Sequence, residues 1–547
     1  MHRPLATGLF LIVASCHGTP GAKLSGAPAG QQQITVTDTL LMRRVAVSLS
    51  ADAMLGRKTG TAGADSAAQY IAAECRALGF QPIGASWFQQ VPLLESTIDT
   101  AGTRVRVTGP GVDTVFHHHD EFIVDLGTRS TLRGFSGDLA YVGRAHDILF
   151  RRSELPPLKG KVALMRGEFG FNVAAADTLA DRGAVGVIEV VDDARRFRLF
   201  RQTRGTSRLS VDDSTVTSSV IPPLPAVMAG PRMTVTLYQG LTGVTHGSWN
   251  DAYLNGLAAG LPSPQVIPGW RVDVSIATRE ATLASVNVAC LLPGRGATAD
   301  SALVVTAHLD HLGIGAPDER GDSVYNGFFD NATGVGMALA VGGWFSQERA
   351  AGRGLGHSLI LLFPTGEEQG LLGADYFATH PLWPLGRMTA LFNFDANAPP
   401  GPPVSWRVAG VDDGPLVGAV VSGAALRGWT TSIAPAAPGS DYYAFLQRGV
   451  AAVFFVPSDG TYEGMSITLS DSLRTGLWTR YHQPGDEYSP AFGFAGLMRY
   501  ATFTRDLLLS VDRAFPPRVP DPGAVGTAAR HCAGRDQTVC AHAWSGT

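Results

Sequence analysis

Short runs of apolar residues recur along the second half of the chain and alternate with segments of helical periodicity. The apolar runs are residues 285–291, 302–307, 358–363, 390–394 and 450–456. The helical segments are about residues 331–347, 369–378, 414–426, 442–447 and 494–511. Strands that alternate with helices form a mostly parallel sheet that is covered by helices on both faces. We therefore predict an α/β fold with a mostly parallel or mixed sheet.

The first half of the chain has a different pattern. Apolar residues at helical spacing predict helices over residues 35–54 and 66–78, and residues 87–107 alternate as strands do. From about residue 110 to residue 250, short strands and many turns surround one helix, which we expect at residues 172–182. This change predicts a β-rich domain inserted into the α/β domain.

The N-terminus resembles an export signal. His2 and Arg3 precede an apolar run, residues 5–14, that is too short to span a bilayer. The sequence Val-Ala-Ser-Cys at residues 13–16 resembles a bacterial lipobox, which is cleaved before the cysteine that carries the lipid. An ordinary signal peptide with an incidental cysteine is the alternative. We expect an exported protein, either a periplasmic or outer-membrane lipoprotein or a secreted one, that touches membrane only through an N-terminal lipid anchor.

These patterns predict the following organisation. We expect a signal peptide at residues 1–15, a tether at 16–34, the first part of the α/β domain at 35–109, the inserted β-rich domain at 110–255, the main part of the α/β domain at 256–515, and a C-terminal tail at 516–547.

Composition and charge narrow the range of partners. The chain has 547 residues, of which 45% are hydrophobic and 16% charged, and this balance is typical of a well-buried globular enzyme. Its net charge of −4 gives no reason to expect nucleic acid as a partner. Among the cysteines, Cys75 and Cys290 lie in apolar patterns and are expected to be buried thiols. Cys532 and Cys540 share the polar tail and could pair in an oxidising compartment.

Polar residues with metal-binding side chains follow three of the predicted strands. His308 and Asp310 end the run at 302–307, Glu367 and Glu368 follow the run at 358–363, and Asp395 follows the run at 390–394. The carboxyl ends of parallel strands meet at one edge of a sheet, where ligand sites form. Imidazole and carboxylate groups brought together there predict a divalent metal site.

Two further stretches complete this set of residues. Asp330 opens the helix predicted at 331–347, and His482 lies in a turn rich in proline and glycine. Taken singly, each residue has a simpler explanation: Glu367 and Glu368 could cap a helix, His308 could lie in the core, and His482 could lie in a surface turn.

Six short motifs occur in a fixed order. They are His-x-Asp at 308–310, Asp-Asn-Ala-Thr-Gly at 330–334, Glu-Glu-x-Gly-Leu-x-Gly at 367–373, Asn-x-Asp at 393–395, Ser-Asp-Tyr at 440–442 and Tyr-His-x-Pro-x-Asp at 481–486. Together they resemble the M28 family of co-catalytic zinc aminopeptidases. The inserted segment is similar to the protease-associated (PA) domain, on its entry at 158–162 and its strand at 183–188.

The resemblance implies a two-zinc site that acts on peptide substrates. It assigns one Zn²⁺ to His308 and Asp395, the other to Glu368 and His482, and a bridging role to Asp330. It also implies further roles: Glu367 as general base, Tyr481 near the developing oxyanion, Asp310 orienting His308, Asp486 supporting the His482 turn, and a cis peptide bond between Asp330 and Asn331. A metal-dependent aminopeptidase is therefore the predicted function.

Three alternatives stay open at this point. A glutaminyl-cyclase-like enzyme of the same general fold would use a single zinc. A carboxypeptidase of the same superfamily would need arginines at the substrate carboxylate. A non-catalytic binding protein on the same scaffold would be expected to lack some of the metal ligands.

Overall fold

The computed structural model describes most of the chain between residues 36 and 515. The described residues are 36–125, 127, 131–167, 173–190, 197–198, 200–201, 207–248, 251–252, 262–396, 398–411 and 414–515. The expected signal peptide, tether and C-terminal tail, with Cys16, Cys532 and Cys540, lie outside these residues.

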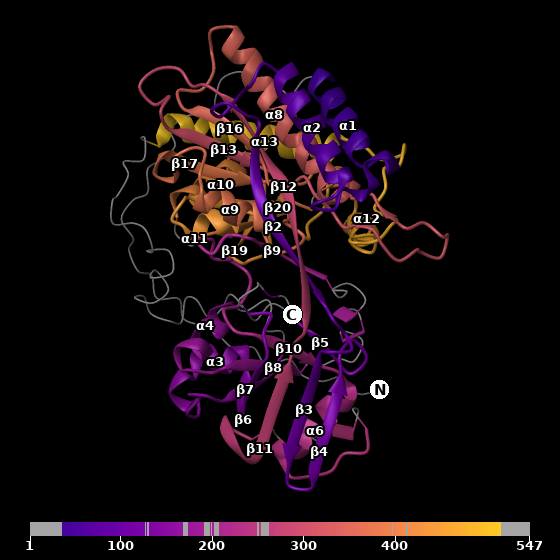
Figure 1. Ribbon diagram of the computed structural model, residues 1–547. Helices are drawn as coiled ribbons and strands as arrows, with labels where there is room; N and C mark the ends of the chain where they lie inside the picture. Colours follow the sequence, from indigo (N-terminus) through magenta and orange to yellow (C-terminus); the bar gives the residue numbers. More distant parts are fainter. Residues whose placement is uncertain are drawn as a thin grey trace, which may run out of the picture.

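A ten-stranded sheet forms the centre of the larger part of the molecule (Figure 1). In spatial order its strands are β19 (Thr430–Pro435), β18 (Ser405–Gly410), β20 (Ala452–Pro457), β17 (Met388–Asn393), β13 (Ala302–Thr306), β16 (Ser358–Phe363), β12 (Thr278–Leu292), β2 (Phe88–Ile98) and β9 (Ser207–Val211), with β1 (Gln81–Pro82) paired to β12. The central strands β20, β17, β13 and β16 are parallel, whereas β12, β2 and β9 pair antiparallel. The predicted mixed α/β sheet is confirmed.

Helices cover both faces of this sheet because its central strands are apolar on both sides. In β13, Leu303 and Val305 pack into one core cluster and Val304 packs into another, as the alternation of side chains along a strand requires. The first cluster includes residues of α1 (Val36–Leu49), α2 (Ala62–Ala77), α8 (Thr333–Ala350), α10 (Pro415–Ala425) and α13 (Ala495–Ala514). The second includes residues of α9 (Leu372–Thr379) and α11 (Tyr442–Gln447).

A second, eight-stranded sheet forms the smaller part of the molecule, which lies at the bottom of Figure 1. Its order is β4 (Val112–His117), β3 (Arg104–Gly109), β11 (Gln265–Ser275), β6 (Phe135–Arg144), β7 (Val162–Arg166), β8 (Gly186–Val190), β10 (Ala226–Ala229) and β5 (Phe122–Val124). Among the described residues, the helices beside it are α3 (Ala145–Phe150), α4 (Val173–Asp181) and α6 (Pro231–Thr242). The expected strand, helix and strand around residues 160–188 are present as β7, α4 and β8. The likeness to a PA domain stays a prediction.

The chain passes between the two sheets along paired strands. It leaves the large sheet by β2 and enters the small one by β3, and it returns by β11 and β12. β2 pairs with β12 in one sheet and β3 pairs with β11 in the other. The small sheet therefore takes in residues on both sides of the expected 110–255 insertion. Within the insertion, β9 comes back to the large sheet and pairs with β2.

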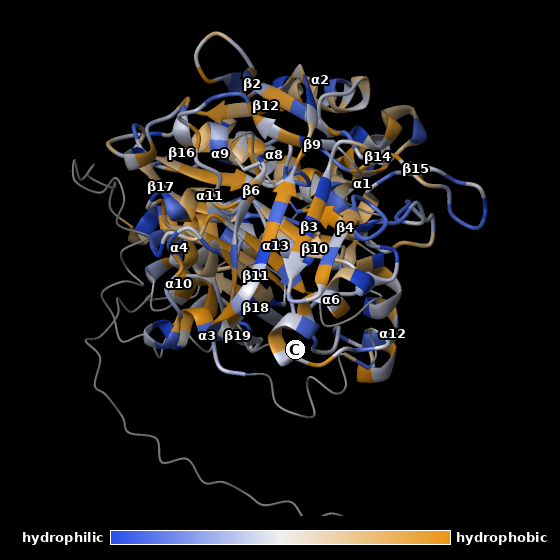
Figure 2. Ribbon diagram, turned by 60° about the horizontal axis from the view of Figure 1, so that its bottom comes forward, coloured by the Kyte–Doolittle hydropathy of each residue, from blue (hydrophilic) through white to orange (hydrophobic). Residues whose placement is uncertain are grey.

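Some elements in and around the large sheet were not predicted from the sequence. β19 is an edge strand that has no buried residue, and its polar residues give little hydrophobic alternation. The helix α12 (Ile467–Trp478) leaves Ile467, Leu469 and Trp478 exposed, so its sequence lacks a clear buried stripe. Figure 2 shows a hydrophilic loop that projects between β14 (Gly313–Ile314) and β15 (Val324–Tyr325).

Among the described residues, no helix has the length and apolar character needed to cross a membrane.

Cys75 and Cys290 form a disulfide, so the prediction that they are free buried thiols is wrong. Their Cα atoms lie 6.2 Å apart, and the bond links α2 to β12 over 215 residues of sequence. Both residues are fully buried, because α2 packs directly against β12. The apolar pattern predicted burial of each residue but not their contact. The bond ties the helix that precedes the insertion to the strand that follows it.

Loss of this disulfide should destabilise the protein measurably. Because the bond closes a long loop in the unfolded chain, the double variant Cys75→Ala/Cys290→Ala should lose about 2–5 kcal/mol of unfolding free energy. Urea denaturation followed by circular dichroism measures the change, and added reductant should shift the midpoint of the parent but not that of the variant. Equal midpoints for parent and variant would contradict the structural role of the bond.

Candidate metal centre

Three neighbouring parallel strands end at one edge of the large sheet, and polar residues follow each of them. β13 lies between β16 and β17, and the chain just beyond these strands carries His308, Glu367 and Asp395 respectively. Asp330 comes from a short π-helical segment, Phe328–Ala332, that precedes α8, and His482 comes from the turn that follows α12. The structure therefore brings together residues that are scattered over the sequence, at the edge where α/β sheets form their sites.

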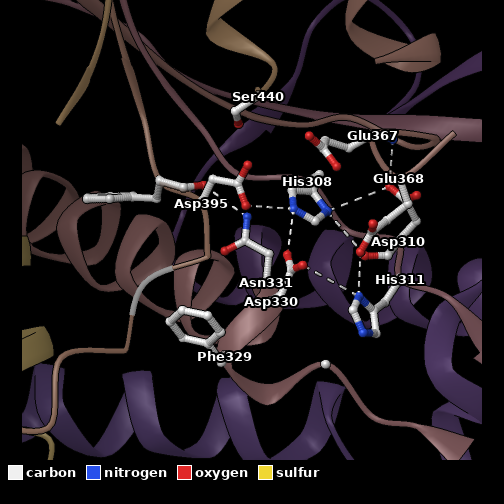
Figure 3. Close-up of polar contacts among 12 residues, drawn as sticks. His308, Asp310, His311, Phe329, Asp330, Asn331, Glu367, Glu368, Asp395 and Ser440 are labelled. Atoms are coloured by element: carbon white, nitrogen blue, oxygen red, sulfur yellow. Dashed lines mark hydrogen bonds and ion pairs between the residues drawn. The ribbon is translucent and has the colours of Figure 1, made fainter. Parts of the chain in front are cut away.

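The first group of side chains surrounds His308, which is 1% exposed. Its Nε2 atom lies 3.0 Å from Oδ1 of Asp395 and 3.1 Å from Oδ1 of Asp330. A carboxylate oxygen of Glu367 also lies within 4.8 Å of ligand atoms of His308 and Asp395. Figure 3 shows these side chains pointing toward one another. They could hold one cation.

The second group surrounds the other oxygen of Asp330. Nε2 of His482 lies 3.1 Å from Oδ2 of Asp330 and 3.0 Å from Oε2 of Glu368. Nδ1 of His311 lies 2.5 Å from Oε1 of Glu368 and 3.9 Å from Oδ2 of Asp330. The two oxygens of Asp330 thus face different groups, which is the arrangement a carboxylate needs to bridge two cations.

His311 is a member of this second group that the sequence reasoning missed. It is 1% exposed, and its ring lies 5.7 Å from that of His482. The only signal in the sequence is its place directly after His308-Leu309-Asp310. At the end of a strand the alternation of side chains stops, so the sequence pattern did not indicate which way His311 points. Its contact with Glu368 is one that would hold a ligating carboxylate in place.

The charges of the two groups stabilise one another. Burial alone would lower the pKa of His308, but the carboxylate of Asp395 and other nearby acids outweigh it and raise that pKa well above 6.5. Burial would also lower the pKa of His482, but Glu368 and Asp330 outweigh it and raise this pKa to about 11. Burial would raise the pKa of Asp330, yet its contacts with His308 and His482 hold it well below its usual value. The group is therefore a set of carboxylates whose negative charge attracts protons or metal cations.

Glu367 differs from these residues in its protonation behaviour. Burial, together with the nearby acids Asp395 and Glu368, raises the pKa of Glu367 well above its usual value, although His308 opposes this. A raised pKa means that the carboxylate takes up a proton more readily, as a group that accepts a proton during a reaction must. Glu367 therefore has the property of a general base. Burial would also raise the pKa of its neighbour Glu368, but His482 and His311 outweigh it and lower this pKa to about 2, so Glu368 stays ionised as a ligand does.

Asp310 supports the centre chiefly through other residues. Nδ1 of His308 lies 3.2 Å from the main-chain oxygen of Asp310 and 3.9 Å from its carboxylate Oδ1. The carboxylate itself accepts hydrogen bonds from Thr59 Oγ1, at 2.9 Å, and from the main-chain N–H of Glu367, at 3.2 Å. It thus links the turn that bears His308 to the turn that bears the glutamates.

Asp486 supports the segment that carries Asp330. Its carboxylate accepts hydrogen bonds from the main-chain N–H groups of Phe329, at 2.9 Å, and Asp330, at 3.2 Å. Burial raises the pKa of Asp486 to about 6. The peptide bond between Asp330 and Asn331 is cis, which confirms the expectation from the resemblance. The turn at 482–486 is therefore joined through one carboxylate to the segment that carries Asp330.

Tyr481 lies directly on the ring of His482. The two rings are stacked, with centroids 3.8 Å apart and planes inclined by 19°. Burial, with Asp330 and Glu368 nearby, raises the pKa of Tyr481 well above 10, so the phenol keeps its proton. A protonated phenol beside the second group can donate a hydrogen bond to an oxyanion.

The donor set fits zinc. Imidazole nitrogens and carboxylate oxygens are ligands that Zn²⁺ takes in catalytic sites. Within the described residues, Oδ1 of Asp330 and Nε2 of His311 form no well-aligned hydrogen bond, although both atoms are buried. Oδ1 of Asp330 lies 3.1 Å from Nε2 of His308. A cation bound by these two atoms would accept a lone pair from each of them.

Comparison with known proteins assigns the family. Residues 287–492 match the sequence model of peptidase family M28. Residues 287–492 are therefore a peptidase domain of this family, and the protein is a zinc metallopeptidase. A comparison with the curated proteins finds no match.

Solved structures give weaker likenesses. An aminopeptidase from Aneurinibacillus sp. strain AM-1 is 17% identical, covers 90% of this chain and 98% of its own, and has a TM-score of 0.49. A zinc aminopeptidase from Bacillus subtilis is 15% identical, covers 89% of this chain and 96% of its own, and has a TM-score of 0.43. An Acidobacteriales bacterium glutaminyl cyclase is 16% identical, covers 43% of this chain and 75% of its own, and has a TM-score of 0.31. Since all three TM-scores are below 0.5, these likenesses do not decide the substrate or the number of metal ions.

Asp486→Asn tests the supporting role of this carboxylate. The amide still fills the space, but it holds the N–H groups of Phe329 and Asp330 less strongly, so Asp330 should be less well positioned. We expect the affinity for zinc to fall by roughly 10- to 100-fold, as outer contacts to metal ligands typically give. Competition with a chromophoric chelator measures it.

Asp512→Asn is the matched control. Asp512 accepts hydrogen bonds from the main-chain N–H groups of Gly356 and His357, just before the start of β16 and so at the opposite edge of the sheet. This variant should keep the zinc affinity of the parent. If Asp486→Asn also kept it, the link between Asp486 and the metal centre would be wrong.

Proposed function

We propose that this protein is a two-zinc aminopeptidase that removes residues from the N-termini of peptides. The observation that carries the proposal is the position of Asp330, whose two carboxylate oxygens face two separate sets of ligands. The match of residues 287–492 to the model of peptidase family M28 supports peptide hydrolysis. The number of ions and the preference for N-termini are the parts that this proposal adds.

The ligands divide between two positions. His308 and Asp395 would hold one ion, Glu368 and His482 the other, and Asp330 would bridge them. His311 would fix Glu368 through the contact between Nδ1 and Oε1. Zinc in such a pair supplies Lewis acidity toward the scissile carbonyl and lowers the pKa of a water to about 7.

The other residues of the site handle the proton and the developing charge. Glu367 accepts the proton of the attacking water and then donates it to the leaving amine, a transfer for which its raised pKa is suited. The Tyr481 hydroxyl donates a hydrogen bond to the oxygen of the tetrahedral intermediate. Acidic side chains near the second position also favour the positive α-amine of a peptide, which supports cleavage at the N-terminus.

A single-zinc glutaminyl-cyclase-like enzyme is the second candidate. It needs one set of ligands, whereas two groups of metal-binding side chains are present here, on either side of Asp330. A binding protein on the same scaffold is a third candidate, and the presence of all five expected ligands in these groups weighs against it. Both candidates predict no removal of N-terminal residues.

We also propose that the protein acts outside the cytoplasm, as the N-terminal signal indicates. The disulfide between Cys75 and Cys290 supports this location, because such bonds persist in oxidising compartments. The proposal includes a lipid on Cys16, which mass spectrometry of the processed N-terminus would detect.

Glu367→Gln is the sharpest test of the chemistry. The variant should keep its zinc but lose at least about 99% of its activity toward aminoacyl anilides, because general acid–base catalysis contributes typically 10²- to 10⁴-fold. Its companion Glu368→Gln should lose zinc as well as activity. Elemental analysis by mass spectrometry counts the metal in both. If Glu367→Gln hydrolysed the substrate as fast as the parent, Glu367 would not be the base.

The choice of substrate tests the preference for N-termini. The parent should hydrolyse leucyl anilide, and acetylation of the α-amine should abolish this activity, since the acetylated nitrogen carries no charge. Removal of metal with a chelator should stop the reaction, and added zinc should restore it. Equal hydrolysis of the free and acetylated substrates would contradict aminopeptidase activity, and cyclisation of N-terminal glutamine by a protein with one zinc would favour the second candidate.

A further inference from the structure

Arg57, a residue outside the segment that matches the family model, is buried against the metal centre. It is 1% exposed and ends the short helix Asp52–Arg57, next to the long helices of the N-terminal part. Its backbone lies in the left-handed region, with φ of 53°, as do those of Leu55 and Gly56 before it. A non-glycine residue is rarely held in this region, so the surrounding contacts fix its conformation.

Among the residues that the structure describes, the guanidinium group donates to main-chain carbonyl groups alone. Nε lies 3.0 Å from the oxygen of Leu309, and Nη2 lies 3.0 Å from the oxygen of Gly327. Nη1 lies 2.6 Å from the oxygen of Asn326 and 2.5 Å from that of Leu49. Arg57 therefore connects the turn at 308–311, which carries His308 and His311, to the turn at 326–330, which carries Asp330.

Neighbouring contacts join the same segments. The main-chain oxygen of Arg57 accepts a hydrogen bond from the N–H of His311 at 3.2 Å. Two residues later, the hydroxyl of Thr59 donates to the carboxylate of Asp310. Asn326 in turn donates through Nδ2 to the main-chain oxygen of Ser50, at 2.9 Å. Both ligand-bearing turns thus rest on the segment at 50–59.

The charge of Arg57 also matters for the site. Burial lowers the pKa of Arg57 to about 10, and the carboxylates of Asp330, Asp486, Asp310 and Glu368 oppose that fall, so the group stays cationic at neutral pH. A nearby cation repels a bound metal ion, so this charge does not itself raise metal affinity. It offsets the mutual repulsion of the carboxylates before metal enters.

We propose that Arg57 is a positioning residue of the metal centre, which holds the turns at 308–311 and 326–330 in the arrangement that receives the ions. The inference rests on the proposed function, because it assumes that these turns bind zinc. A purely structural role would hold the N-terminal helices to the domain and leave the metal centre unaffected.

The two roles differ in what a substitution changes. Arg57→Met keeps much of the volume but removes all four hydrogen bonds and the charge. Arg57→Lys keeps the charge, but a single ammonium group cannot reach all four carbonyl groups. If Arg57 positions the ligands, both variants should bind zinc roughly tenfold or more weakly than the parent. Both should also change the visible absorption of the cobalt-substituted protein, which reports ligand geometry.

Arg208 provides the matched control. It too is buried, at 3% exposure, and burial lowers the pKa of Arg208 to about 10. It donates to the main-chain oxygens of Ser207 and Val124, in β9 and β5, and not to the ligand-bearing turns. Arg208→Met should lower the thermal midpoint of the metal-free protein, as Arg57→Met should, but it should leave zinc affinity and the cobalt spectrum as in the parent.

The experiment measures zinc affinity by chelator competition, the cobalt spectrum and the metal-free thermal midpoint in all four proteins. Weaker zinc binding and an altered cobalt spectrum in both Arg57 variants, with neither in Arg208→Met, supports the proposal. Zinc affinity unchanged within about twofold in Arg57→Lys overturns it, even if Arg57→Met fails to fold. A parent that binds no zinc overturns the proposed function and this inference together, whereas a parent that binds two ions beside unaffected Arg57 variants overturns the inference alone.

Discussion

Several buried carboxylates lie together at one edge of the large sheet, and the segments around them are arranged to offset their charge. Asp310, Asp330 and Asp395 are each at most 5% exposed, and Glu367 and Glu368 lie beside them. Burying an ionised carboxylate without partners costs several kcal/mol. The fold offsets this cost with three imidazoles, with main-chain N–H groups and with Arg57. The same negative charge makes the edge a place for cations.

The inserted segment also contributes to the surroundings of the site. Between β9 and β10 the chain lies on the large sheet's helices: Ser219 donates to the carboxylate of Asp375 in α9, through both its N–H and its hydroxyl. Val220 and Ile221 pack in the core cluster that includes Leu371 and lie against Gly370, in the turn that presents the two glutamates. The small sheet is thus joined to the large one through the strands β2 and β12, through β9 and through this contact. The turn that bears Glu367 and Glu368 therefore contacts both Asp310 and the inserted segment.

Much of the fold could be predicted from the sequence, because its central strands are buried on both faces and read as continuous apolar runs. β16 was predicted to its exact ends, and so was α11. The sequence did not indicate which elements contact one another. The examples are the Cys75–Cys290 bond, the pairing of β9 with β2, and the pairing of the polar edge strand β19 with β18. Each depends on tertiary packing, and local periodicity does not record it.

The candidate site follows the same division. The expected ligands His308, Asp330, Glu368, Asp395 and His482 could be picked out because each follows a strand or opens a turn in a recognisable motif. His311 was missed since its direction is set by the turn at 308–311, and Arg57 was missed since a lone arginine in a glycine-rich segment has no periodic signal. The resemblance implied that Asp486 supports the His482 turn; its carboxylate accepts hydrogen bonds from the main-chain N–H groups of Phe329 and Asp330. Side chains that act through main-chain atoms leave little trace in a sequence pattern.

The central claim is that Asp330 bridges two metal ions. Anomalous diffraction at the zinc absorption edge, from a crystal of the zinc-loaded protein, tests it most directly. We expect two peaks about 3.5–4 Å apart, one between His308 and Asp395 and the other between Glu368 and His482, with a carboxylate oxygen of Asp330 toward each. A single peak, or peaks away from Asp330, would contradict it.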